Sequence, residues 1–130
     1  MEGYRVLLVD DEEEFVSALS ERLALRGIEV DAALDGEEAL AMLRDNEPDV
    51  VILDVMMPGL SGLEVLKQIK VTHPHSQVIL LTGHGSTKEG IEGMRLGALD
   101  YLIKPVDIEE MLEKMSQAVK AAGTGGSDGS

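Results

Sequence analysis

The chain has 130 residues, of which 44% are hydrophobic and 28% charged, and its formal net charge is −14. This composition excludes a disordered chain and a membrane-embedded one, because the apolar residues suffice for one core and no apolar run is long enough to cross a bilayer. The negative charge opposes direct binding to nucleic acid, and the absence of cysteine excludes disulfides and thiolate metal sites. Since the first residues also lack the features of a signal peptide, we expect a cytoplasmic protein that does not enter membranes.

Short apolar runs alternate with helical patterns along the whole chain. Strands are predicted at residues 5–10, 28–33, 50–54, 77–81 and 98–103. Helices are predicted at residues 12–26, from 35 through 43, from 61 to about 71, from 86 to 96, and from 107 to about 121. Strands of this kind, separated by helices, are typical of a parallel sheet covered on both faces. We therefore predict a flavodoxin-like, doubly wound α/β fold with a five-stranded sheet in the order 2-1-3-4-5 and five helices.

The end of the chain differs in composition from the rest. Residues 122–130 are rich in glycine and serine, which is typical of a flexible segment. We therefore predict one domain over residues 1–121, followed by a flexible tail over residues 122–130.

Polar side chains stand at the ends of four predicted strands: Asp10 and Asp11 follow the first, Asp54 ends the third, Thr82 follows the fourth and Lys104 follows the fifth. In a doubly wound sheet these carboxyl ends lie at the crevice where function is found. A single aspartate at a strand end is most often a turn or capping residue. All five residues at the correct ends indicate a site.

The residue types of this site point to phosphoryl chemistry. Three close carboxylates repel one another unless a cation is present, and oxygen ligands suit Mg²⁺ better than zinc. With the ion bound, one carboxylate can attack phosphorus and form an aspartyl phosphate. Lys104 and the metal can offset the charge of the phosphoryl oxygens, and the hydroxyl of Thr82 can donate a hydrogen bond to one of them.

The sequence resembles the receiver domains of two-component response regulators. The matching stretches are residues 9–11, 54–62, 81–83 and 100–105, and the resemblance extends from residue 4 to about residue 121. It implies a signalling domain, not an enzyme, in which Asp54 accepts a phosphoryl group from a histidine kinase or a phosphotransfer protein. The resemblance also implies how Mg²⁺ is bound: by Asp11, Asp54 and the main-chain carbonyl of Met56, with Asp10 contributing through water.

Family resemblance further implies a switch. Thr82 moves toward the phosphoryl group, Tyr101 turns from an exposed to a buried position, and the face made by the fourth helix, fifth strand and fifth helix then signals to a partner protein or output domain. A phosphorylation-dependent homodimer is one form that this response can take. In receivers the bond corresponding to Lys104–Pro105 is commonly cis, and we expect the same here.

Three finer expectations concern residues around the site. Met56 and His84, each two residues after a site residue, are candidates for controlling water access to the phosphate. Phe15 follows the core periodicity of its helix but lies on the side where receivers often dock a kinase. The segment 81–86 resembles receivers of enhancer-binding transcription activators.

Three other readings are less compatible with the residues. A phosphatase with an aspartate nucleophile needs a second acid two residues later, where this chain has Met56. A flavodoxin needs a Ser/Thr-rich phosphate loop after the first strand, where this chain has Asp10 and Asp11. A degenerate receiver, which only binds proteins, would lack part of the five-residue set that is complete here.

Overall fold

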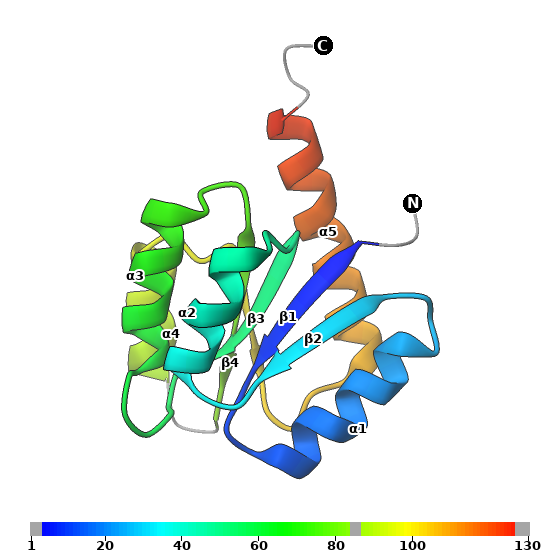
Figure 1. Ribbon diagram of the computed structural model, residues 1–130, viewed down its shortest axis with the longest axis horizontal. Coiled ribbons are helices and arrows are strands. Elements are labelled where there is room, and N and C mark those ends of the chain that lie inside the picture. The colour runs from blue at the N-terminus through cyan, green and yellow to red at the C-terminus, as the bar shows by residue number, and fades with distance from the viewer. Residues whose placement is uncertain (1–3, 84–86, 127–130) are drawn as a thin grey trace.

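The structure, a computed structural model, describes residues 4–83 and 87–126. Five parallel strands form one sheet in the order β2-β1-β3-β4-β5 (Figure 1). The strands are β1 (Arg5–Val9), β2 (Glu29–Ala33), β3 (Val50–Asp54), β4 (Gln77–Thr82) and β5 (Asp100–Ile103). The helices are α1 (Glu13–Ala24), α2 (Gly36–Asp45), α3 (Gly62–Thr72), α4 (Thr87–Arg95) and α5 (Ile108–Gly126). The predicted fold class and strand order are confirmed.

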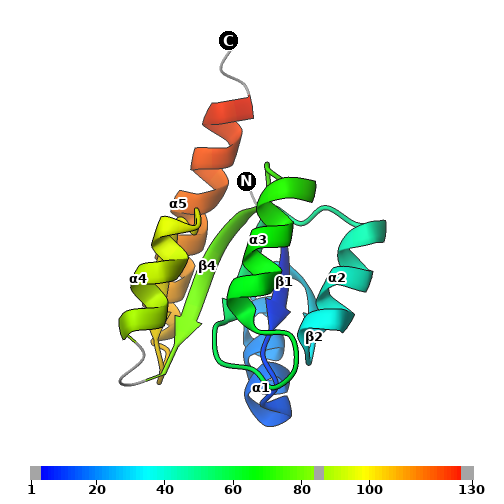
Figure 2. The ribbon, with the colours of Figure 1, turned by 90° about the vertical axis from the view of Figure 1, so that its left-hand side faces the viewer.

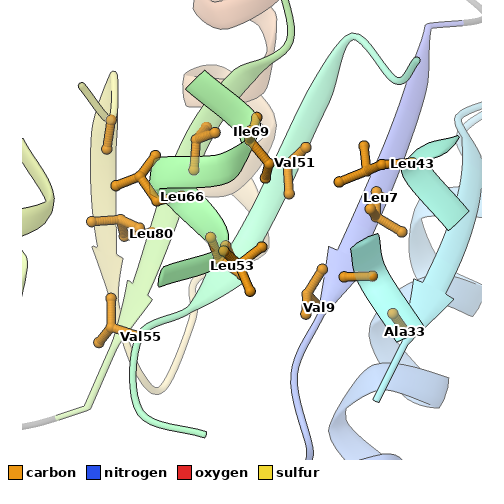
Figure 3. Close-up of a cluster of buried hydrophobic side chains, with 14 of the residues drawn as sticks. Leu7, Val9, Ala33, Leu43, Val51, Leu53, Val55, Leu66, Ile69 and Leu80 are labelled. Carbon is orange, nitrogen blue, oxygen red and sulfur yellow. The ribbon is translucent and has the colours of Figure 1, made fainter. Parts of the chain in front are cut away.

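Helices cover both faces of the sheet and create two hydrophobic cores. Helices α1 and α5 lie on one face, and α2, α3 and α4 lie on the other (Figures 1 and 2). Because side chains alternate along a strand, Leu7 and Val9 enter the core under α2 and α3, whereas Val6 and Leu8 enter the core under α1 and α5. Figure 3 shows the first of these cores. The central strands are therefore buried on both sides, which fixes the positions of their carboxyl ends.

Capping residues set the starts of several helices. The side chain of Asp35 accepts a hydrogen bond from the N–H of Glu38 at 2.7 Å and caps α2. Ser61 caps α3 through a 3.3 Å bond from the N–H of Glu64. Asp107, which precedes α5, accepts from the N–H of Glu109 at 3.0 Å. These bonds satisfy N–H groups that have no partner within the first turn of a helix.

The last helix is longer than predicted. Helix α5 continues to Gly126, so the prediction that it ends near residue 121 is wrong. Glycine weakens a helix by about 1 kcal/mol per residue but, unlike proline, it neither removes an N–H group nor clashes with the preceding turn. A prediction from composition alone therefore ends this helix too early. Residues 127–130 of the predicted tail lie outside the described residues, and a domain boundary at residue 121 stays a prediction. Within residues 4–83 and 87–126, no helix combines the length and hydropathy needed to cross a membrane.

Gly62 brings the start of α3 directly against the end of β3. A Cβ atom at this position would overlap the carbonyl oxygen of Asp54 and would lie 2.7 Å from the Cα of Val55. Only glycine lets the two backbones approach this closely. The close approach matters for function because Asp54 is one of the predicted site residues.

Replacing Gly62 with alanine should lower the free energy of unfolding by about 1–3 kcal/mol, because the added methyl must displace backbone atoms instead of a flexible side chain. Chemical denaturation measures this change. Gly90→Ala in α4 is the matched control: its Cβ would lie 3.6 Å from the Cγ2 of Thr82, an ordinary contact, and helix propensity favours alanine by about 1 kcal/mol. Equal losses in the two variants would contradict the account.

Candidate phosphoacceptor site

Three aspartates meet at the carboxyl edge of the sheet. Asp10, Asp11 and Asp54 each present a carboxylate oxygen, and these oxygens lie within 4.8 Å of one another. Asp10 is completely buried, Asp54 is 5% exposed and Asp11 is exposed. The structure thus brings together the three carboxylates that the sequence placed at the ends of two strands.

Main-chain N–H groups orient the two buried carboxylates. Asp10 follows β1, and its Oδ1 accepts a hydrogen bond from the N–H of Glu12 at 2.9 Å. Asp54 ends β3, and its Oδ1 accepts from the N–H of Met56 at 3.0 Å. Each aspartate therefore has one oxygen held by the turn that follows its strand, which leaves Oδ2 for other partners.

Lys104 enters the same site from the end of β5. Its ammonium lies 2.6 Å from Oδ2 of Asp10, 2.8 Å from Oε1 of Glu12 and 3.8 Å from Oδ2 of Asp54. The same group lies 4.8 Å from the centre of the Phe15 ring, within the range of a cation–π interaction. The Lys104–Pro105 peptide bond is cis, as expected. The contacts with Glu12 and Phe15 were missed, since nothing in the sequence links residues so far apart in the chain.

Thr82 and Tyr101 lie on neighbouring strands but in different surroundings. Thr82 is buried, and its hydroxyl donates a long hydrogen bond, 3.4 Å, to the carbonyl of Leu102 in β5. Tyr101 is 42% exposed, and the ammonium of Lys114 from α5 lies 5.9 Å from its ring centre. The tyrosine therefore occupies the outward position that the resemblance assigns to the unphosphorylated state.

The remaining predicted residues lie at the rim of the site or outside the described chain. Met56 is 57% exposed, and Phe15 is half-buried against the core under α1 and α5. His84 lies outside the described residues, so its role in water access stays a prediction.

Crowding and burial determine the electrostatics of the site. Burial raises the pKa of Asp54 to about 6, the N–H of Met56 opposes this increase, and the charge of Asp10 adds to it. Burial alone would lower the pKa of Lys104, but its hydrogen bonds to Asp10 and Glu12 outweigh that effect and raise it. The Lys104 side chain therefore stays protonated and positively charged, yet it faces more carboxylates than one ammonium can neutralise. A divalent cation fits this surplus, and a set of carboxylate oxygens is what Mg²⁺ prefers.

Known protein families and structures agree with this geometry. The family described as the response regulator receiver domain matches residues 6–116. The chain belongs to this family. Membership makes it a phosphoacceptor signalling module of a two-component system rather than an enzyme, with a pocket formed by Asp10, Asp11, Asp54 and Lys104. An acidic cluster of this kind is typical of the Mg²⁺ site of receivers, and the family implies a cognate histidine kinase and an output partner.

Individual relatives resemble the receiver in sequence and in structure. The response regulator MprA of Mycobacterium sp. strain KMS is 43% identical over 111 residues, which are 85% of this chain and 48% of that regulator. The receiver domain of NtrX from Brucella abortus is 32% identical, with a TM-score of 0.84 over 88% of this chain and 98% of that one. A receiver domain protein from Clostridium thermocellum is 37% identical, with a TM-score of 0.86 over 91% and 95% of the two chains. The chain therefore spans about half the length of the curated relatives it matches, and the subfamily suggested by residues 81–86 stays a prediction.

Without Mg²⁺, Asp54→Asn should stabilise the domain, and the gain should depend on pH. The folded-state pKa of about 6 exceeds the ordinary value of 3.8, so the folded chain binds this proton more tightly and loses stability as pH rises from about 4 to 6. The asparagine variant lacks this loss. Its advantage in unfolding free energy should grow over that range to about 1–3 kcal/mol above pH 6. Denaturant titrations in EDTA at several pH values measure it, and a constant difference would contradict the pKa assignment.

Proposed function

We propose that Asp54 is the residue that accepts the phosphoryl group, from a phosphohistidine of a histidine kinase or phosphotransfer protein. The observation that supports this choice is the contrast among the three aspartates. Asp10 is fully buried and paired with Lys104 at 2.6 Å, and Asp11 is exposed. Asp54 combines near-complete burial with an ammonium 3.8 Å from Oδ2, which is close enough to act on charge that develops there but is not a tight ion pair.

The proposed step is a direct transfer between donor and acceptor. A carboxylate oxygen of Asp54 attacks the phosphorus of the phosphohistidine. The new O–P bond forms as the P–N bond breaks, and the electron pair of the P–N bond returns to the imidazole of the donor. Lys104 offsets the charge of the phosphoryl oxygens, and Thr82 donates a hydrogen bond to one of them. Asp11, Asp54 and the main-chain carbonyl of Met56 would hold Mg²⁺, with Asp10 acting through water. The bound ion would supply the charge that lets one carboxylate approach an anionic phosphoryl group.

The proposed signal travels from Thr82 to the neighbouring strand. The hydroxyl of Thr82 donates to the carbonyl of Leu102 over 3.4 Å, so this bond is weak enough to be exchanged for a phosphoryl oxygen. Leu102 is the neighbour of Tyr101, and a shift of β5 here would release the outward position of that ring. The surrounding face of α4, β5 and α5 exposes several large apolar residues: Ile91, Met94, Leu99, Tyr101 and Ile103. Such a patch suits a partner, an output domain or a second copy of the chain.

The donor protein would approach along the α1 side of the site. A groove beside Lys104 is lined by α1 and the residues after β5, including Phe15, Ala18, Pro105 and Val106. Lys104 lines this groove and also contacts Asp10 and Asp54, so a donor helix that docks here would carry its phosphohistidine toward Asp54. Because this donor is expected to be a kinase of two-component signalling, the cytoplasm is the compartment that belongs to this proposal.

Asp54→Asn should abolish phosphorylation, because an amide cannot replace the carboxylate nucleophile. The measurement is incorporation of ³²P from phosphoramidate in the presence of Mg²⁺, which requires no knowledge of the cognate kinase. Asp107→Asn is the matched control: it removes the same charge, and asparagine caps a helix as well as aspartate does. The Asp107→Asn control should incorporate ³²P to the same extent as the parent chain. Label retained in Asp54→Asn would show that another residue is the acceptor.

Thr82→Ala should separate phosphorylation from signalling. Labelling by phosphoramidate should fall by no more than about 5-fold, since a hydrogen bond to a charged group contributes about 1.5–3 kcal/mol but a water molecule that takes the place of the hydroxyl restores most of it. The response of Tyr101 to beryllofluoride and Mg²⁺, followed by its ring NMR signals, should disappear. Tyr4, the only other tyrosine, is an internal reference. A full Tyr101 response in the variant would refute the proposed route.

A further inference from the structure

Glu12 occupies a capping position but does not cap. It precedes α1 with an extended backbone (φ −87°, ψ 98°), and its side chain makes no hydrogen bond to the first turn. Short polar side chains at this position typically stabilise a helix by accepting a hydrogen bond from its first turn. The chain places a glutamate there instead, and its carboxylate reaches Lys104 at 2.8 Å. The main chain of Glu12 is fixed by its N–H bond to the Oδ1 of Asp10.

Lys104 is held on the α1 side of the site. Three groups on that side contact its ammonium: Asp10 at 2.6 Å, Glu12 at 2.8 Å and the ring of Phe15 at 4.8 Å from its centre. Among the three carboxylates paired with this ammonium, that of Asp54 is the most distant, at 3.8 Å, which is beyond hydrogen-bonding range. The ammonium of Lys104, which the proposed function needs near the oxygens of Asp54, therefore lies closer to Asp10 and Glu12.

The side chain of Glu12 differs from that of Asp10 in lying outside the candidate metal cluster. The cluster that could hold a metal consists of Asp10, Asp11 and Asp54 and does not include Glu12. Asp10 is thus shared between Lys104 and the proposed metal set, whereas the Glu12 carboxylate, among the described residues, pairs with Lys104 only. Its exposed carboxylate stays available to compete for the ammonium when the site is loaded.

We propose that Glu12 is a positioning residue that retains Lys104 on the α1 side and opposes its movement to Asp54 when a phosphoryl group or its analogue is bound. This inference rests on the proposed function of Asp54. Glu12 would lower the affinity of the site for the phosphoryl state without touching the phosphoryl group. Exposed ion pairs are individually weak, so the expected effect is a modest bias, not an on–off switch.

The test is the affinity of the full chain for beryllofluoride in the presence of Mg²⁺. Glu12→Gln should bind beryllofluoride about 2- to 5-fold more tightly than the parent chain. Glu13→Gln, which removes the same charge from the next exposed residue, should change the affinity less than 1.5-fold, because no ion pair among the described residues joins Glu13 to Lys104. In a Lys104→Met background, the effect of Glu12→Gln should vanish.

A second readout examines the pair in EDTA, without metal or ligand. The ¹³Cε–¹Hε NMR signal of Lys104, assigned with Lys104→Arg, should shift in Glu12→Gln and stay in place in Glu13→Gln. Unchanged or weaker beryllofluoride binding by Glu12→Gln, an equal gain in Glu13→Gln, or a gain that persists in Lys104→Met would each overturn the role of Glu12. Absence of beryllofluoride binding in the parent chain would instead overturn the proposed function, and the Lys104 signal would still report whether the pair exists.

Discussion

Three carboxylates whose oxygens lie within 4.8 Å of one another, two of them buried, face a single ammonium at the edge of a rigid sheet. The sheet enforces this crowding, because β1 and β3 pair directly and both are packed between two cores. Because the carboxylates cannot move apart, their negative charge must be offset in another way. A proton does so when the pKa of Asp54 rises to about 6, and a divalent cation does so more completely. The same excess of negative charge that destabilises the resting site thus favours a divalent cation, which in turn would let an anionic phosphoryl group approach.

Connection between the site and the surface depends on β5. Lys104 follows this strand, and its N–H donates to the carbonyl of Thr82 at 2.9 Å. The hydroxyl of Thr82 donates to Leu102, and the next residue toward the start of the strand is the exposed Tyr101. One four-residue strand, β5, therefore joins Lys104 to the proposed docking face. In the proposed switch, a local change of charge at Asp54 would bias the whole face because these contacts are few and the 3.4 Å bond from Thr82 is weak.

The strand order and the placement of the carboxylates could be predicted from the sequence for the same reason. Once parallel strands are recognised, their carboxyl ends must share an edge, so the placement of Asp10, Asp54 and Lys104 needs no side-chain detail. Contacts that depend on the length and conformation of side chains could not be predicted in this way. The pair between Glu12 and Lys104 spans 92 positions, and Glu12 stands among acids that are otherwise typical of a solvated helix start. The predicted end of α5 is wrong because a glycine-rich composition favours a flexible segment without preventing a helix; unlike proline, glycine does not block the helical backbone.

The most direct test of the central claim is chemical identification of the phosphorylated residue. An aspartyl phosphate is an acyl phosphate, and borohydride reduces it to homoserine, whereas a free aspartate does not react. The chain should be phosphorylated with phosphoramidate and Mg²⁺, reduced, digested and sequenced by tandem mass spectrometry. The account predicts homoserine at position 54 alone. Homoserine at position 10 or 11, or none in a chain that carries ³²P, would contradict it.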